Sequence, residues 1–389
     1  MAGLKERLLK ASTQDMTSVL SKSKMFNEKD VLRTKIPMLN IALSGALTGG
    51  MKSGLTIFAG PSKHFKSNMA LTMVAAFMKK HEDAICLFYD SEFGITPEYL
   101  AAMGVNPDQV IHTPITSVEQ IKIDMANQLK EVKRGEKVIV LIDSIGNMAS
   151  KKEIEDAENE KTTADMTRAK AMKSLFRIIT PYFSTKNIPC IAINHTIQTI
   201  EMFSKTVMTG GTGPMYAADT VFYIGKRQIK DAKSSEIEGF QFVLNAEKSR
   251  YVKEKSKFFI DVTFSGGIDP YSGLLDMAIE LGFVVKPKVG WHCRVMTING
   301  TKMQESKSWR AKDTSCPEFW SPLFKSAEFR DAIEKRYKLS SIESNIEVEE
   351  ELARIIDGKL DNSGAGINFN QAESAADKEQ QLEDFGDDE

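Results

Sequence analysis

Short apolar runs alternate with helical patterns along the first half of the chain. The runs have the length and the β-branched content of buried strands, and they occupy residues 55–59, 84–90, 137–143 and 188–194. Between them, apolar side chains recur at helical spacing over residues 68–81, 117–132 and 167–182. Strands that alternate with helices predict an α/β fold, with a mainly parallel twisted sheet that helices cover on both faces.

The second half of the chain has a different pattern. Three strand candidates follow one another with little helix between them, which predicts an antiparallel extension of the sheet. They occupy residues 220–227, 240–247 and 257–264. Beyond residue 270, Asn299 and Gly300 are typical of a β-hairpin turn, and residues 322–337 have a helical pattern. These signals predict a small C-terminal α+β domain.

The pattern divides the chain into four predicted parts. They are an N-terminal arm at residues 1–35, an α/β core at 36–270, a C-terminal domain at 271–345, and a linker with a disordered acidic tail at 346–389. Within the arm, Leu4, Leu8 and Leu9 form one side of an amphipathic helix. Such a helix docks either on its own core or on another protomer, and the pattern alone leaves both open.

Composition narrows the class of protein. The chain has 389 residues, of which 42% are hydrophobic and 27% are charged, so a fully disordered protein is excluded. No run of about 18 apolar residues is present, and the N-terminus lacks the apolar core of a secretory signal, so we expect a cytoplasmic protein without membrane contact. The four cysteines have no paired spacing, which predicts neither disulfides nor a zinc site.

Charge is distributed unevenly along the chain. Residues 370–389 contain eight acidic residues and one lysine, so they carry −7 of a net charge of −2 and leave +5 on the remainder. The tail is either a solvated, disordered end or an anionic competitor that folds back over a basic surface for DNA. The near-neutral total therefore does not exclude nucleic-acid binding.

The first apolar run leads into a candidate phosphate-binding loop. The loop consists of Gly60, Pro61, Ser62, Lys63, His64, Phe65, Lys66 and Ser67, and a helical pattern follows at once. A strand, a loop and a helix in that order present backbone N–H groups to an anion, with Lys66 for the β- and γ-phosphates and the Ser67 hydroxyl for Mg²⁺. The alternative is an ordinary turn between a strand and a helix.

Phe65 departs from the usual phosphate-loop pattern, which has glycine before the lysine. If this position needs a left-handed backbone, a residue other than glycine costs about 1–2 kcal/mol there. The cost is tolerable, but it leaves the motif incomplete, so the neighbouring strand ends must support the interpretation.

Polar side chains follow three other strand candidates. Asp143 and Ser144 end one, where a carboxylate would orient the water shell of a metal ion. Glu92 follows another and is a candidate base for an attacking water, whereas Asp90 still lies within the strand. His195 ends a third and would sense the γ-phosphate. A helix cap, a surface glutamate and a structural histidine are the respective alternatives, but these ends converge on one sheet edge.

The sequence resembles RecA-type recombinases, and within them the UvsX branch of T-even-like phages, over nearly its whole length. The segments that carry the resemblance are residues 60–67, 87–94 with Pro97 and Tyr99, 141–144, 193–195, 209–213 and 247–250. The phage branch shares the Phe before the lysine. His195 stands where cellular RecA proteins have Gln, so its role transfers less directly.

The resemblance implies roles for further residues. Asn68 and Tyr99 would contact the nucleotide, with the Tyr99 ring stacked on adenine. Lys248 and Arg250 would reach the γ-phosphate held by a neighbouring subunit, and strand alternation places both on one face. A core tyrosine and a solvated basic edge are the alternatives.

Two segments resemble the DNA-binding loops of the family, at residues 150–165 and 196–214. The implied DNA-binding residues are Lys170, Lys173 and Arg177 beside the first loop, and Ile200, Met202, Phe203, Gly210 and Gly211 in the second. The basic residues recur at helical spacing, and the apolar ones suit wedges between bases. A solvated helix face and a local apolar cluster are the alternatives.

The resemblance implies an ATP-dependent and Mg²⁺-dependent recombinase that forms helical filaments on single-stranded DNA and exchanges strands with duplex DNA. Glu92, Lys66, Lys248 and Arg250 would be its catalytic residues. Lys302, Lys307 and Arg310 of the C-terminal domain would capture the duplex, and a phage mediator and a single-strand-binding protein would assist. The alternatives are a hexameric helicase motor on the same core and a nucleotide-binding filament scaffold with little hydrolysis.

Overall fold

The structure is a computed structural model that describes residues 3–23, 30–159, 167–199, 204–231, 234–298 and 300–339. The chain divides into a compact unit, Met1–Leu339, and a second unit, Ser340–Glu389, which lies outside the described residues. The predictions for Ile200, Met202, Phe203 and the acidic tail therefore fall outside the part of the chain described below.

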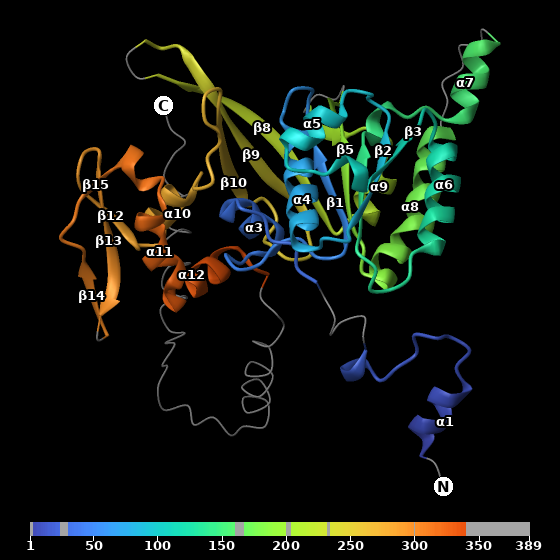
Figure 1. Ribbon diagram of the computed structural model, residues 1–389, viewed down its shortest axis with the longest axis horizontal. Coiled ribbons are helices and arrows are strands. Elements are labelled where there is room, and N and C mark those ends of the chain that lie inside the picture. The colour runs from blue at the N-terminus through green and yellow to red at the C-terminus, as the bar shows by residue number, and fades with distance from the viewer. Residues whose placement is uncertain are drawn as a thin grey trace, which may run out of the picture. The chain divides into compact units, whose positions relative to one another are not determined.

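A nine-stranded sheet forms the centre of the compact unit, in the order β11-β10-β9-β8-β1-β5-β4-β2-β3 (Figure 1). The strands from β8 to β3 in this order are parallel, and β9, β10 and β11 continue the sheet in antiparallel fashion. The bounds are β1 Gly54–Ala59, β2 Ile85–Asp90, β3 Val110–Pro114, β4 Val138–Asp143, β5 Pro189–Asn194, β8 Thr220–Lys230, β9 Ile237–Ser249, β10 Lys257–Thr263 and β11 Gly267–Ile268. The predicted α/β fold with an antiparallel extension is confirmed.

Helices cover both faces of the sheet because the central strands are apolar on both sides. Leu55 and Ile57 of β1 pack with helices α6 and α8, whereas Phe58, on the other face of the strand, packs with α3 and α4. The helices are α3 Pro37–Ser44, α4 Lys66–Lys80, α5 Pro97–Ala102, α6 Val118–Glu131 and α8 Thr167–Lys186. Strands whose side chains are buried on both faces are typical of parallel sheets.

The two predicted DNA-binding loops contain regular structure, which corrects their interpretation as loops throughout. The first begins with helix α7, Lys151–Glu158, because Ser150 and Glu153 form a capping box at its start. The second contains a hairpin of β6, Thr196–Gln198, and β7, Thr206–Met208, and then helix α9, Gly213–Ala217.

The C-terminal part of the unit combines a small sheet with helices. Its elements are α10 Leu274–Glu280, β12 Val284–Lys288, β13 Trp291–Ile298, β14 Thr301–Gln304, β15 Trp309–Arg310, α11 Pro317–Lys325 and α12 Ala327–Tyr337. Ile298 pairs with Thr301, so the predicted two-residue hairpin is confirmed. The helical pattern predicted at 322–337 is instead two helices, because the chain breaks at Ser326, whose hydroxyl caps α12.

The described part of the N-terminal arm contains helix α1, Leu4–Ala11, and a 3-10 turn at Leu20–Lys22. The apolar side chains of α1 are mostly exposed, 64% for Leu4 and 63% for Leu8. In the described ranges, no helix combines the length and the apolar character needed to cross a membrane.

Candidate functional site

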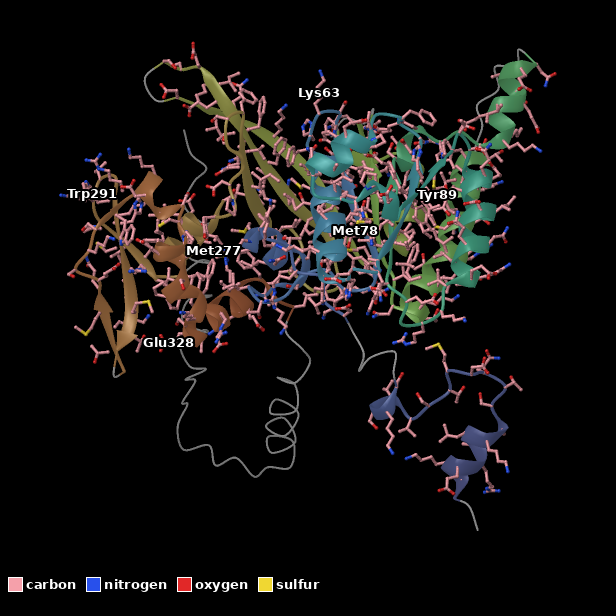
Figure 2. The ribbon with its side chains drawn as sticks, viewed as in Figure 1. Lys63, Met78, Tyr89, Met277, Trp291 and Glu328 are labelled. Carbon is pink, nitrogen blue, oxygen red and sulfur yellow. The ribbon has the colours of Figure 1, made fainter. Side chains whose placement is uncertain are left out.

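The candidate phosphate loop lies at the carboxyl end of β1, in the middle of the sheet. Its first residue, Gly60, donates its N–H to the Asn194 carbonyl of β5 at 3.2 Å, and a Cβ here would lie 3.0 Å from the Ile224 carbonyl of β8. Lys63 and Phe65 have left-handed backbones, with φ of 59° and 60°. Figure 2 shows Lys63 projecting from the edge of the sheet at which α4 begins.

Phe65 has the left-handed backbone that the sequence analysis considered as a source of strain. A residue other than glycine in this region costs about 1–2 kcal/mol. The Phe65 ring stacks on Phe242 of β9, with ring centroids 5.0 Å apart and planes 16° apart. Such an aromatic pair contributes about 0.5–1.5 kcal/mol beyond its buried area, which offsets most of the strain.

Lys66, the first residue of α4, brings a buried ammonium group into the loop. Its side chain is 6% exposed, and Nζ donates a hydrogen bond to the Pro61 carbonyl at 2.8 Å. Burial lowers the pKa of Lys66, while the nearby carboxylates of Glu92 and Asp143 act in the opposite direction. The loop lysine and both predicted carboxylates therefore share one site.

Asp143 and Ser67 form the part of the site that suits a metal ion. The Ser67 hydroxyl donates to Asp143 Oδ2 at 2.7 Å, and Asp143 Oδ1 is buried without a hydrogen-bond partner among the described residues. Burial raises the pKa of Asp143 to about 6, and the charges of Glu92 and Asp90 contribute to this increase. A hydroxyl beside a carboxylate with an unpartnered buried oxygen fits Mg²⁺ and its water shell.

Glu92 and Asp90 have different surroundings, although they are two residues apart. Asp90 is 2% exposed, and its Oδ1 accepts the backbone N–H groups of Glu92 and Phe93 at 3.0 and 2.8 Å. These bonds shape the turn that presents Glu92 to the site. The hydrogen bond from His195 lowers the pKa of Glu92, with Ser144 and Lys66 adding to the effect against the cost of burial. An ionised Glu92 is suited to accept a proton.

His195 connects the site to the β6–β7 hairpin through a chain of hydrogen bonds. Its Nε2 lies 2.8 Å from Glu92 Oε1. Its N–H donates to Asn194 Oδ1 at 2.8 Å, and the same oxygen accepts the Thr209 hydroxyl at 2.8 Å. The Thr209 N–H returns to the His195 carbonyl at 3.0 Å. A change at Glu92 therefore has a direct structural route to the segment that resembles the second DNA-binding loop.

The side chains predicted to contact the nucleotide beyond its phosphates, Asn68 and Tyr99, contact each other at the start of α4. Asn68 Nδ2 donates to the Tyr99 hydroxyl at 2.6 Å, and Tyr99 is 38% exposed. Ser144 follows Asp143 through a cis peptide bond, and its N–H donates to the Ser91 hydroxyl at 3.0 Å. Ser62 and Lys63 are exposed in the loop, and His64 Nδ1 lies 2.9 Å from the Ser62 carbonyl.

Lys248 and Arg250 do not reach this site within one chain. The Arg250 N–H donates to the Asp219 carbonyl at 3.1 Å, and the Asp219 carboxylate accepts the N–H of Leu55 at 2.9 Å. Arg250 thus lies at the amino end of β1, a strand of about 20 Å, whereas the phosphate loop follows its carboxyl end. Lys248 is the closer of the two, and its Nζ donates to the Met215 and Tyr216 carbonyls at 2.9 and 3.0 Å.

The predicted DNA-binding residues that the structure describes gather on and beside α8. Lys170, Lys173 and Arg177 are exposed on this helix. Gly210 and Gly211 have positive φ and lie against it, and a Cβ at Gly211 would lie 3.2 Å from the Ala169 side chain. The glycines therefore permit close approach of the second segment to the basic helix.

Arg168 is a residue that the sequence did not single out. It donates from Nε to the Met148 carbonyl at 2.7 Å and from a terminal nitrogen to the Gly146 carbonyl, so it ties α8 to the chain that follows Asp143. Its spacing from Lys170 and Lys173 gives no sign of this role, because its partners are backbone groups distant in sequence. Thr209, in contrast, lay within a segment that carried the family resemblance.

Comparison with known families agrees with this geometry. The RecA N-terminal domain matches residues 3–269, more than half of the chain. This chain belongs to the RecA family. A second family, described as the C-terminal domain of the recombination and repair protein of bacteriophage T4, matches residues 271–333.

One RecA-family relative matches this chain over its whole length, and others match most of it. The recombination and repair protein of Enterobacteria phage T4 is 66% identical over 389 residues, covering 100% of this chain and 98% of that protein. Protein RecA of Paenarthrobacter aurescens is 29% identical over 72% of this chain and 81% of its own length, and Protein RecA of Cutibacterium acnes is 25% identical over 64% and 71%. The predicted membership of the phage branch of RecA-type recombinases is confirmed.

Proposed function

We propose that this protein is an ATP-dependent strand-exchange recombinase that assembles as a helical filament on single-stranded DNA. It would serve homologous recombination, repair and recombination-dependent replication of a phage in the cytoplasm of its host. One observation carries the proposal: Lys66, Asp143 and Glu92 meet at one sheet edge, and His195 links them by hydrogen bonds to the segment that resembles a DNA-binding loop.

The positions of these side chains support the proposed hydrolysis of ATP. The loop N–H groups and the Lys66 ammonium hold the β- and γ-phosphates, and Asn68 and Tyr99 lie where the rest of the nucleotide would leave the loop. A water placed beside Glu92 attacks the terminal phosphorus, Glu92 accepts its proton, and the bond to the bridging oxygen breaks. Lys66 compensates the negative charge that develops on the phosphate oxygens.

A magnesium ion fits the Ser67 and Asp143 pair. The Ser67 oxygen would bind the ion directly, and Asp143 would hold it through water, which satisfies the unpartnered Oδ1. Bound Mg²⁺ would supply positive charge to the phosphates. Its charge would also keep Asp143 ionised at neutral pH, against the burial that raises the pKa of this carboxyl.

A neighbouring protomer completes the site in this proposal. Lys248 and Arg250 lie toward the end of the strands opposite the phosphate loop. They would therefore meet a nucleotide only if protomers stack head to tail. A head-to-tail contact that does not close into a ring produces a helical filament. The exposed Leu4 and Leu8 of α1 provide an apolar surface for docking on such a neighbour.

DNA would lie along α8 and the β6–β7 hairpin. The basic residues Lys170, Lys173 and Arg177 are suited to backbone phosphates, which a protein without sequence preference must contact. The hydrogen-bond chain from Glu92 through His195 to Thr209 would couple nucleotide state to this surface. Ile200 and Phe203 retain their proposed role as wedges between bases.

The C-terminal domain would capture the incoming duplex. Lys302 is exposed on β14, Lys307 Nζ lies 3.5 Å from the Trp309 ring centroid, and the Arg310 guanidinium lies 5.3 Å from that of Trp291. Cations beside aromatic rings are suited to nucleic-acid surfaces. A phage mediator and a single-strand-binding protein are the further partners we propose.

Electron microscopy with single-stranded DNA, together with a phosphate-release assay, tests the function. We expect open filaments whose length depends on ATP, and hydrolysis that DNA stimulates. Closed rings that unwind a tailed duplex would favour the helicase motor. Filaments that form without DNA-stimulated phosphate release would favour the scaffold.

A further inference from the structure

We propose that Phe242 of β9 and Lys226 of β8 are positioning residues that hold the phosphate loop in its nucleotide-binding shape. The proposal rests on the proposed binding of nucleotide at this loop, and it adds two residues that lie outside the loop and far from it in sequence. Phe242 acts through the Phe65 ring, and Lys226 acts through the Lys63 carbonyl.

The loop needs such a restraint because two of its residues are in a backbone region that they rarely adopt. Lys63 has φ 59° and Phe65 has φ 60°, and neither is glycine. The direction of the loop N–H groups depends on these angles, since successive N–H groups converge on an anion only when the backbone turns this way. Without a restraint, the loop would relax and the N–H groups would diverge.

Phe242 restrains the loop at Phe65. The two rings are stacked, with centroids 5.0 Å apart and planes at 16°. Phe242 is 3% exposed and belongs to the apolar cluster on the α4 face of the sheet, so its ring is fixed by the core. Phe65 is only partly buried and packs against that cluster. The rigid partner therefore determines the position of the loop residue.

Lys226 restrains the loop at Lys63. It pairs with Phe242 across the β8–β9 ladder, and its Nζ lies 3.4 Å from the Lys63 carbonyl oxygen, to which it donates. The same ammonium lies 3.7 Å from the centroid of the Phe240 ring. The contact with Phe240 limits the freedom of the lysine side chain. Both left-handed residues of the loop are thus held from one strand pair.

This arrangement explains how the chain keeps a phenylalanine where phosphate loops usually have glycine. A loop held in its bound shape loses less conformational freedom when the nucleotide binds, so its affinity is higher. The affinity for ATP should consequently depend on Phe242 when residue 65 is phenylalanine. It should depend on Phe242 much less when residue 65 is glycine, which adopts the left-handed backbone without help from a neighbouring ring.

A double-mutant cycle measured with a fluorescent ATP analogue tests the proposal. Phe242→Leu should weaken binding about tenfold in the parent protein and less than about twofold in a Phe65→Gly background, because residues in contact are coupled. Phe329→Leu is the matched control, since Phe329 also forms a buried aromatic pair, with Phe283 at 5.1 Å, in the C-terminal part of the unit. Equal weakening by Phe242→Leu in both backgrounds, or none in the parent, overturns the proposal.

Lys226→Met gives a second test with little risk to folding, and Arg227→Met, an exposed neighbour on β8, controls for the lost charge. We expect about threefold weaker ATP binding for Lys226→Met and no change for Arg227→Met, since the contact of an ammonium group with the Lys63 carbonyl is lost only in the first. Equal effects would overturn the role of Lys226. A parent protein that binds no ATP would instead remove the proposed function itself.

Discussion

Single residues of the site have opposing requirements in the empty and the loaded protein, and Asp143 illustrates this best. Its carboxyl is buried beside two other acids, yet the proposed Mg²⁺ site needs it ionised. The folded chain holds a proton on Asp143 up to about pH 6, whereas the ordinary pKa of an aspartate carboxyl is 3.8. The unfolded chain therefore loses this proton first, and the stability of the fold decreases as the pH rises between these values.

The Asp143→Asn variant should consequently be more stable than the parent in the absence of nucleotide. We expect a gain of up to about 3 kcal/mol at pH 8, decreasing toward zero as the pH is lowered to 4, because a shift of one pKa unit corresponds to about 1.4 kcal/mol. Denaturant unfolding at several pH values measures this gain. Asp331→Asn on the exposed side of α12 is the control, and a gain independent of pH would contradict the assignment.

Substitution of Glu92 tests its proposed role as the base. Glu92→Gln keeps an oxygen that can accept the hydrogen bond from His195 but cannot accept the proton of the attacking water. We expect ATP hydrolysis to decrease about 10²–10⁴-fold, with ATP affinity nearly unchanged. Phosphate release and nucleotide titration measure the two quantities. Glu98→Gln on neighbouring α5 is the control, and a Glu92→Gln protein that hydrolyses as fast as the parent would exclude Glu92 as the base.

Helix α8 presents the basic residues that we expect to bind single-stranded DNA. Lys173→Ala should weaken single-stranded DNA binding and reduce the slope of log affinity against log salt by about 0.7, the value for one lost phosphate contact on a single strand. Lys79→Ala, exposed in the last turn of α4, should change neither quantity. Binding titrations at several salt concentrations measure both. An unchanged slope for Lys173→Ala would favour a solvated helix face without a role in binding.

The strand pattern explains why the sequence predicted the residues of the site better than the full set of helices and strands. Parallel strands end at one edge, so Lys66, Asp143, Glu92 and His195 could be assigned to one place from strand patterns alone. Strand β3 went unpredicted because it is a half-exposed edge strand, with Ile111 49% exposed. Helix α7 went unpredicted because its charged sequence buries no side chain and depends on the cap at Ser150.

Contacts between distant segments could not be predicted in the same way. The partner of Phe65 is Phe242, and no local pattern connects a loop residue to a strand so far along the chain. Strand alternation indicated that Lys248 and Arg250 share a face. It did not show at which end of the neighbouring strands Arg250 lies. The antiparallel pairing of β9 with β8 shows that this end lies away from the phosphate loop.

For the whole molecule, the arm should contribute to assembly and not to the fold. Leu4→Asp combined with Leu8→Asp should leave the unfolding temperature unchanged, since both side chains are mostly exposed. The concentration needed for ATP-dependent assembly, measured by light scattering, should rise at least about tenfold, because two buried leucines contribute several kcal/mol to an interface. A Lys5→Asp control changes the charge of the same helix. Unchanged assembly would show that α1 does not dock on a neighbour.

In the proposed filament, each nucleotide is held between two protomers, with Glu92 from one and Arg250 from the next. Glu92→Gln and Arg250→Ala proteins, each nearly inactive alone, should complement each other when mixed. In an equal mixture, about a quarter of the head-to-tail contacts pair an intact Glu92 with an intact Arg250, so DNA-stimulated ATP hydrolysis should recover to about a quarter of the parent rate. A mixture no more active than the mean of the two variants would contradict a site shared between protomers.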